Sequence, residues 1–122
     1  MNRQTLHGRK VLIVEDDYFQ ALETQESLQD AGAEVIGPTG DGAEAERLIS
    51  GHAIDAAVID INLGLGASFE LAGMLKRHGI PFLFVTGYDA AVIPAELSKV
   101  DRLSKPVCSW KIVETVETLL AP

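Results

Sequence analysis

The chain has 122 residues, of which 47% are hydrophobic and 23% charged, and this composition is typical of a single compact folded domain. Ten basic residues against eighteen acidic ones give a net charge of -8 without any run of basic residues, which argues against a nucleic-acid-binding surface. The lone cysteine, the lack of a signal-peptide pattern and the shortness of every apolar run favour a cytoplasmic protein over a secreted or membrane-spanning one. We therefore expect one domain over residues 1–122, with a core of about 9–121 and no output domain.

Short apolar runs alternate with amphipathic stretches along the chain. The apolar runs are rich in β-branched residues and end abruptly in polar ones, as strands buried on both faces do. The stretches between them carry apolar side chains at helical spacing. In chain order, the pattern predicts a strand at 11–14, a helix at 18–31 that ends before Gly32, a strand at 34–37, a turn at 38–42, a helix ending before Gly51, a strand at 56–59, a helix capped by Ser68, a strand at 81–85, a weak helix distorted by Pro94, a strand at 101–103 and a helix capped by Ser109.

Five strands that alternate with five helices predict the α/β class. Strands joined in this way pair in parallel through right-handed crossovers, which gives a doubly wound sheet with helices on both faces. Ligands of such sheets bind beyond the carboxyl ends of the strands. The residues that follow each strand are therefore the candidates for a functional site.

Polar side chains follow four of the five predicted strands. Glu15 and Asp16 come after the first strand, Asp60 after the third, Thr86 after the fourth and Lys105 after the fifth. Carboxylates gathered in one pocket raise each other's pKa unless a cation lies among them. Oxygen ligands without neighbouring His or Cys suit Mg²⁺ better than zinc. The pattern therefore predicts a magnesium site at this edge of the sheet.

These residue types together favour aspartyl-phosphate chemistry. With a divalent cation present, an ionised Asp60 can attack phosphorus as a nucleophile. Lys105 can share the charge of the phosphoryl oxygens, and the hydroxyl of Thr86 can donate a hydrogen bond to one of them. Asp60 is accordingly the candidate nucleophile.

At these residues the chain resembles the receiver domains of bacterial two-component response regulators. The resemblance covers nearly the whole chain and implies a flavodoxin-like sheet with strand order 2-1-3-4-5. The matching pieces, in the order of the family, are Val14-Glu15-Asp16-Asp17, Asp60 after Ala57-Val58-Ile59, Thr86-Gly87, and Lys105-Pro106.

The resemblance implies a phosphoacceptor and its metal ligands. Asp60 would accept a phosphoryl group from a phosphohistidine of a sensor histidine kinase or a histidine phosphotransfer protein. Mg²⁺ would be held by Glu15, Asp16, Asp60 and the backbone carbonyl of Asn62. Phosphorylation would change the protein-interaction surface, and the protein would catalyse only its own phosphorylation and dephosphorylation.

The resemblance also implies how the signal is read out. Thr86 and Lys105 would contact the phosphoryl group, and the peptide bond before Pro106 would be cis. The typical receiver has an aromatic switch residue three positions before the lysine, where this chain has Arg102. Tyr88 is the candidate to take over the switch role.

A longer motif points to a subgroup of the family. The segment Pro81-Phe82-Leu83-Phe84-Val85-Thr86-Gly87-Tyr88 is similar to the Pro-Phe-x-Phe-Ala-Thr-Gly-Tyr motif of a subgroup with many single-domain receivers, with Val85 in place of the alanine. These receivers are paired with kinases of the HWE type and related classes. The resemblance therefore implies a kinase of that type as the phosphodonor.

Two other functions use the same residues. A pseudo-receiver would bind a partner without any phosphorylation, although the set of Asp60, Thr86 and Lys105 argues against it. A small Mg²⁺-dependent phosphatase with an aspartyl-phosphate intermediate would typically carry a second carboxylate two residues after the nucleophile, where this chain has Asn62.

Overall fold

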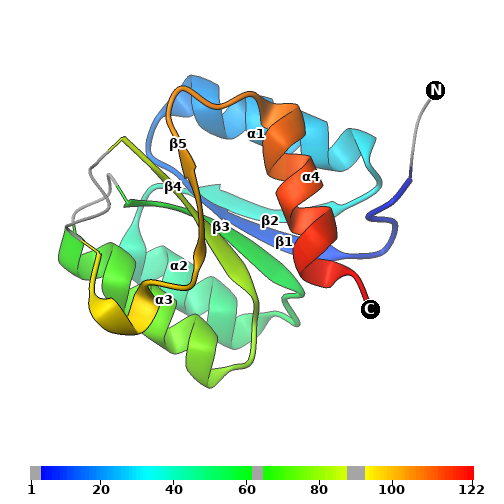
Figure 1. Cartoon of the computed structure of the whole chain (residues 1–122). Coiled ribbons are helices and arrows are strands. Elements are labelled where there is room, and N and C mark those ends of the chain that lie inside the picture. The colour runs from blue at the N-terminus through cyan, green and yellow to red at the C-terminus, as the bar shows by residue number, and fades with distance from the viewer. Residues whose placement is uncertain (1–3, 62–64, 88–92) are drawn as a thin grey trace.

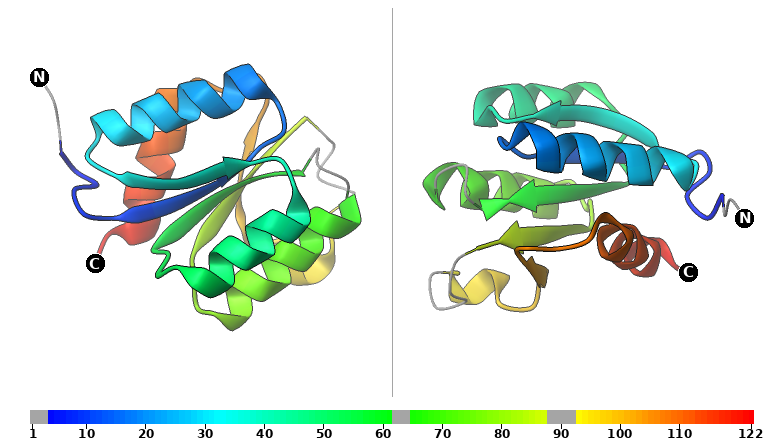
Figure 2. Two further views of the ribbon diagram at one scale, coloured as in Figure 1. Left: turned by 180° about the vertical axis from the view of Figure 1, so that it is seen from behind. Right: turned by 90° about the horizontal axis from the view of Figure 1, so that it is seen from above.

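The computed structural model describes residues 4–61, 65–87 and 93–122 of the chain. It contains one five-stranded sheet with helices on both faces (Figures 1 and 2). The strands are β1 (Lys10–Val14), β2 (Glu34–Thr39), β3 (Ala56–Asp60), β4 (Phe82–Thr86) and β5 (Asp101–Ser104). The helical elements are α1 (Tyr18–Asp30), α2 (Gly42–Gly51), α3 (Leu65–Arg77), the short 3₁₀ helix η3 (Ala95–Leu97) and α4 (Ser109–Leu120).

The strand order is β2-β1-β3-β4-β5, and every neighbouring pair is parallel. Helices α1 and α4 lie on one face of the sheet, and α2 and α3 lie on the other (Figure 2). The predicted α/β class and doubly wound, flavodoxin-like order are therefore confirmed. Strand order decides which strand ends become neighbours, and β1 and β3 lie next to each other near the centre of the sheet.

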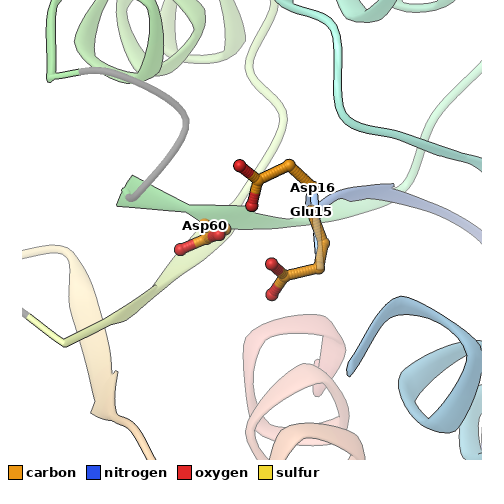
Figure 3. Close-up of side chains that lie close together, drawn as sticks. All are labelled: Glu15, Asp16 and Asp60. Atoms are coloured by element: carbon orange, nitrogen blue, oxygen red, sulfur yellow. The ribbon is translucent and has the colours of Figure 1, made fainter. Parts of the chain in front are cut away.

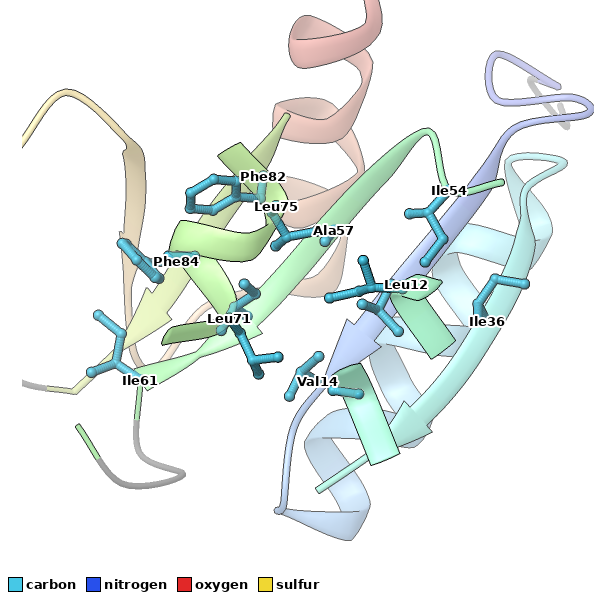
Figure 4. Close-up of a cluster of buried hydrophobic side chains, with 14 of the residues drawn as sticks. Leu12, Val14, Ile36, Ile54, Ala57, Ile61, Leu71, Leu75, Phe82 and Phe84 are labelled. Atoms are coloured by element: carbon cyan, nitrogen blue, oxygen red, sulfur yellow. The ribbon is translucent and has the colours of Figure 1, made fainter. Parts of the chain in front are cut away.

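Successive residues of the strands supply two separate core layers. Leu12 and Val14 of β1 point into the layer beneath α2 and α3, which Figure 4 shows. Val11 and Ile13 of the same strand point into the layer beneath α1 and α4. Alternate residues of a strand face opposite sides, and here both sides are covered. This is why the strands form continuous apolar runs in the sequence.

The first helix begins and ends at residues with clear local roles. Asp17 is the N-cap of α1, and its side chain accepts hydrogen bonds from the backbone N–H groups of Phe19 and Gln20. Gly32, just beyond the helix, has a φ of 97°, which glycine adopts without strain. The predicted end of this helix is confirmed.

The two predicted serine caps are wrong. Helix α3 begins at Leu65, so Ser68 lies within the helix rather than before it. The residue before α4 is Cys108, whose side chain makes no capping hydrogen bond, and the hydroxyl of Ser109 instead accepts a hydrogen bond of 2.6 Å from that of Ser27 in α1. The hydroxyl of Ser68 bonds to the carbonyl of Asp60 at the end of β3, and both hydroxyls thus bond to other elements of the fold, which a local capping pattern does not reveal.

The predicted turn at 38–42 is wrong in its first half, because β2 continues to Thr39. The pairing of β1 with β2 shifts by one residue between Leu12–Ile36 and Val14–Thr39. Gly37 lies in this irregular stretch with a φ of 90°, and a Cβ atom there would come within 3.0 Å of the carbonyl oxygen of Ile13. Pro38 is tolerated because β2 is an edge strand.

The weak helix expected near Pro94 falls partly on residues 88–92, which lie outside the described residues. Of the described residues between β4 and β5, only Ala95–Leu97 are helical, as the 3₁₀ turn η3. Pro94 directly precedes this turn, and Leu97 packs into the core beneath α3. No helix in the described part of the chain is long and apolar enough to span a bilayer.

The burial of α3 predicts that loss of a leucine side chain there destabilises the fold much more than loss of an exposed one in α1. Leu75 in α3 is fully buried, whereas Leu22 in α1 is 38% exposed. Leu75→Ala is expected to lower the free energy of unfolding by about 2–5 kcal/mol, and Leu22→Ala by about 1 kcal/mol or less. Urea denaturation followed by circular dichroism measures both. Equal losses from the two variants would contradict the packing described for α3.

Candidate functional site

The carboxyl ends of β1 and β3 bring three carboxylates together (Figure 3). Val14 of β1 pairs with Ile59 of β3, so the next residues along the two strands, Glu15 and Asp60, end up at the same level of the sheet. Asp16 follows Glu15 as the chain leaves β1. One carboxylate oxygen from each of the three acidic residues lies within 4.8 Å of the others.

The fourth and fifth strands bring the other two predicted residues to the same edge. Thr86 is the last residue of β4 and is buried. Its backbone carbonyl accepts a hydrogen bond of 2.8 Å from the backbone N–H of Lys105, which follows β5. The hydroxyl-bearing residue and the lysine are therefore joined through the main chain.

The ammonium group of Lys105 lies between two of the carboxylates. Its Nζ atom is 3.4 Å from Oδ2 of Asp60 and 3.4 Å from the carboxylate oxygens of Glu15. Burial alone would lower the pKa of Lys105, but the attraction of Asp60 and Glu15 outweighs this effect and raises it. The lysine is therefore charged at neutral pH and neutralises part of the acidic cluster.

The surroundings of Glu15 raise the pKa of its carboxyl group. Its side chain is almost fully buried, and Asp60 is only 1% exposed. Burial is the largest cause that raises the pKa of Glu15, followed by its hydrogen bond to Asp60 and the repulsion between the two carboxylates, and the result is a pKa of about 7. The backbone N–H of Asp17, which donates to Glu15 at 3.1 Å, and the charge of Lys105 act in the opposite direction.

The donor set fits a hard divalent cation. Glu15, Asp16 and Asp60 offer only oxygen atoms, which Mg²⁺ and similar ions prefer. When all groups are ionised, the three negative charges of these carboxylates and the one positive charge of Lys105 leave a net charge of -2. A divalent cation balances this charge. Asp16 is exposed, so the cluster is open to solvent on one side.

Two predicted site residues, Asn62 and Tyr88, lie outside the described residues. Arg102 lies in β5 with an exposed side chain and pairs in register with Phe84. The peptide bond between Lys105 and Pro106 is cis, the isomer that the family resemblance implies.

The sequence patterns missed three residues that hold the acidic cluster in place. The backbone N–H of Glu15 donates to the carbonyl of Thr39 at 2.8 Å. Gly40 packs so closely on Asp16 that a Cβ atom there would lie 3.0 Å from its Cα. Ser68 donates to the backbone carbonyl of Asp60. Glycine at position 40 gave no usable signal, because glycines are common in turns for other reasons.

The raised pKa of Glu15 predicts a pH-dependent stability. The folded protein holds the proton of Glu15 up to a pH of about 7, whereas the unfolded chain releases it near 4.5. The contribution of Glu15 to the free energy of unfolding is therefore fully present below pH 4.5, and it is lost as the pH rises from 4.5 through 7. Glu15→Gln is expected to remove this loss, so that in chelator at pH 8 it is more stable than the unaltered protein by up to about 3 kcal/mol.

Urea denaturation from pH 4 to pH 8 in the presence of chelator measures the free energy of unfolding of Glu15→Gln and of the unaltered protein. Glu23→Gln, on the exposed side of α1, is the matched control and is expected to show no such trend. If the two proteins differ by the same free energy of unfolding at every pH in this range, the pKa of Glu15 is not raised by folding.

Comparison with known proteins identifies a domain family. The family model described as the response regulator receiver domain matches residues 11–117. An uncharacterised response regulatory protein of Vibrio parahaemolyticus is 32% identical over 111 residues, which cover 88% of this chain and 46% of that protein. The transcriptional regulatory protein PdtaR of Mycobacterium tuberculosis is 35% identical over 84 residues, which cover 66% of this chain and 40% of that protein. The chain thus spans less than half the length of these curated relatives.

A solved structure shares the fold over nearly the full length of the chain. The BeF3-activated conformation of SdrG from Pseudomonas melonis superposes with a TM-score of 0.76 and 28% sequence identity, covering 99% of this chain and 100% of that one. The family match, the strand order and the acidic cluster at the ends of β1 and β3 agree with one another. The chain belongs to the response regulator receiver domain family of two-component signalling proteins.

Proposed function

We propose that Asp60 is the phosphoacceptor of this receiver and that the protein acts in a two-component or phosphorelay pathway. The observation that carries the proposal is the position of Lys105, whose Nζ atom lies 3.4 Å from Oδ2 of Asp60 at the end of the central strands. Of the three clustered carboxylates, Asp60 and Glu15 are the two that contact this lysine. Asp60 ends its strand at the sheet edge where ligands of this fold bind.

The proposed reaction moves a phosphoryl group from a phosphohistidine to Asp60. A carboxylate oxygen of Asp60 attacks phosphorus, a P–O bond forms, and the P–N bond to the imidazole breaks. The electron pair of the broken bond stays on the imidazole nitrogen, which takes up a proton. Lys105 stabilises the negative charge on the phosphoryl oxygens, and the hydroxyl of Thr86 donates to one of them once the group has arrived.

Mg²⁺ is the cofactor that we propose for this site. Glu15, Asp16 and Asp60 would hold it, with the carbonyl of Asn62 as the further ligand that the family resemblance implies. A bound divalent cation offsets the charge of the carboxylates and of the incoming phosphoryl group.

The phosphodonor in this proposal is a sensor histidine kinase or a histidine phosphotransfer protein. The motif at residues 81–88 favours an HWE-type kinase, as in the subgroup that it resembles. Phosphorylation adds about -1.5 to -2 charge at pH 7, which rearranges the groups around Thr86 and alters the surface offered to a downstream protein. We propose Tyr88 as the residue that takes the role of the aromatic switch, since Arg102 occupies the usual position.

Replacement of the phosphoacceptor tests the proposal directly. Incubation with acetyl phosphate and Mg²⁺ is expected to give one phosphoryl adduct in the intact-protein mass, and Asp60→Asn is expected to abolish it. Asp101→Asn, an exposed aspartate at the start of β5, is the matched control and is expected to label normally. Chelator is expected to prevent labelling of every variant.

Labelling of Asp60→Asn at the level of the unaltered protein would overturn the assignment of Asp60. Absence of any adduct from both acetyl phosphate and phosphohistidine donors would favour a pseudo-receiver instead. Rapid release of phosphate from small phosphate esters would favour the phosphatase alternative.

Removal of one acidic group tests the metal site separately from phosphorylation. Because Asp16 is exposed, Asp16→Asn is expected to change the free energy of unfolding by less than about 0.5 kcal/mol. The same variant is expected to weaken Mg²⁺ binding by about tenfold or more, since one ligand loses its charge. Isothermal titration calorimetry measures the affinity, with Asp17→Asn as the control, because Asp17 caps α1 and does not belong to the acidic cluster. Equal affinities of Asp16→Asn and the unaltered protein would exclude Asp16 as a ligand.

A further inference from the structure

Ser68 is a fully buried polar residue that links α3 to the end of β3. Its hydroxyl oxygen lies 3.1 Å from the backbone carbonyl oxygen of Asp60 and 3.4 Å from that of Ile61. No part of the residue is exposed to solvent. The contact joins the helix directly to the strand end that carries the candidate phosphoacceptor.

The hydroxyl of Ser68 constrains the backbone at Asp60. A buried hydroxyl without a partner costs free energy, and among the described residues the shorter of the two contacts of Ser68 is that to the carbonyl of Asp60. A carbonyl held in this way fixes the peptide plane that follows Asp60, and hence the ψ angle of that residue. The parallel pairing of Asp60 with Val85 of β4 holds the backbone on the other side. With the backbone held on both sides, the carboxylate of Asp60 can move only by rotation about its side-chain bonds.

An apolar contact next to Ser68 anchors the same turn of helix. The ring of Phe69 packs edge-to-face against that of Phe84 in β4, with 6.1 Å between the ring centroids and an interplanar angle of 79°. Phe84 pairs in register with Ile59, the residue before Asp60. The start of α3 is therefore held against β3 and β4 by a hydrogen bond and by a ring contact in consecutive residues.

We propose that Ser68 is a positioning residue for phosphorylation of Asp60. The proposal rests on the proposed function of Asp60 and adds a residue that touches neither the phosphoryl group nor the metal. Loss of the hydroxyl frees the peptide plane after Asp60, so the carboxylate spends less time at the distance from Lys105 that the reaction needs. A misplacement of this kind slows a reaction much more than it destabilises the fold.

The test compares two buried hydroxyl groups. Ser68→Ala removes the hydroxyl at the site, and Thr24→Val removes one from α1, where Thr24 is 2% exposed and accepts a hydrogen bond from the side chain of Gln20. Ser68→Ala is expected to lower the rate of phosphorylation by acetyl phosphate at saturating Mg²⁺ about tenfold. Thr24→Val is expected to keep the rate within about twofold, even where urea denaturation shows a similar loss of stability.

A second measurement does not depend on phosphorylation. In the protein without phosphodonor, the carboxyl ¹³C resonance of Asp60 is expected to shift or broaden in Ser68→Ala and to stay unchanged in Thr24→Val. If Ser68→Ala does not fold, Ser68→Cys serves in its place, because the somewhat larger thiol leaves no cavity and donates only weakly. The cysteine variant is expected to show both effects in a weaker form.

The outcomes separate this inference from the proposed function. Failure of the unaltered protein to label with both acetyl phosphate and phosphohistidine donors would overturn the role of Asp60, and an altered carboxyl resonance in Ser68→Ala would still show that Ser68 positions that side chain. An unaltered resonance together with a normal rate in the folded variant would overturn the inference alone. Equal slowing by Ser68→Ala and Thr24→Val would also overturn it, because the effect would then be one of stability.

Discussion

Negative charge is concentrated and partly buried at one edge of the sheet, and the surrounding structure compensates for it. Glu15 and Asp60 are almost completely buried side by side, and burial together with the neighbouring Asp60 raises the pKa of Glu15. The ammonium group of Lys105 contacts both, and the backbone N–H of Asp17 donates to Glu15. These contacts neutralise the cluster only in part, so the three carboxylates and Lys105 keep a net negative charge when all four groups are ionised.

The sheet topology explains how residues so far apart in sequence form one cluster. Because β1 and β3 are neighbours in the centre of the sheet, their ends place Glu15 and Asp60 at one level. The backbone hydrogen bond between Thr86 and Lys105 then ties the ends of β4 and β5 together. Lys105 therefore contacts Asp60 at the end of β3 and is bonded to the main chain at the end of β4, so the ends of β3, β4 and β5 are directly connected.

Much of this arrangement is encoded in local patterns. Continuous apolar runs ending in polar residues located β1, β3 and β4 to within one residue at each end, because strands covered on both faces need apolar residues at nearly every position. The edge strands β2 and β5 are more polar and more exposed, and the prediction located them to within two residues. The polar residues that follow these runs are the candidate site residues Glu15, Asp16, Asp60, Thr86 and Lys105. Local patterns were wrong at Ser68 and Ser109, whose hydroxyls bond to other elements of the fold instead of capping their own helices. They were also wrong at Pro38, which an edge strand accommodates.

The sequence by itself therefore determined the class of fold, the approximate positions of the strands and the chemistry at their ends, since these depend on the periodicity and type of neighbouring residues. Only the tertiary structure decided which of these groups contact one another and how their charges interact. The contact of Lys105 with two carboxylates, the raised pKa of Glu15 and the bond from Ser68 to the carbonyl of Asp60 all join separate segments of the chain. Distance and burial set the strength of such interactions, and both arise only when the chain has folded.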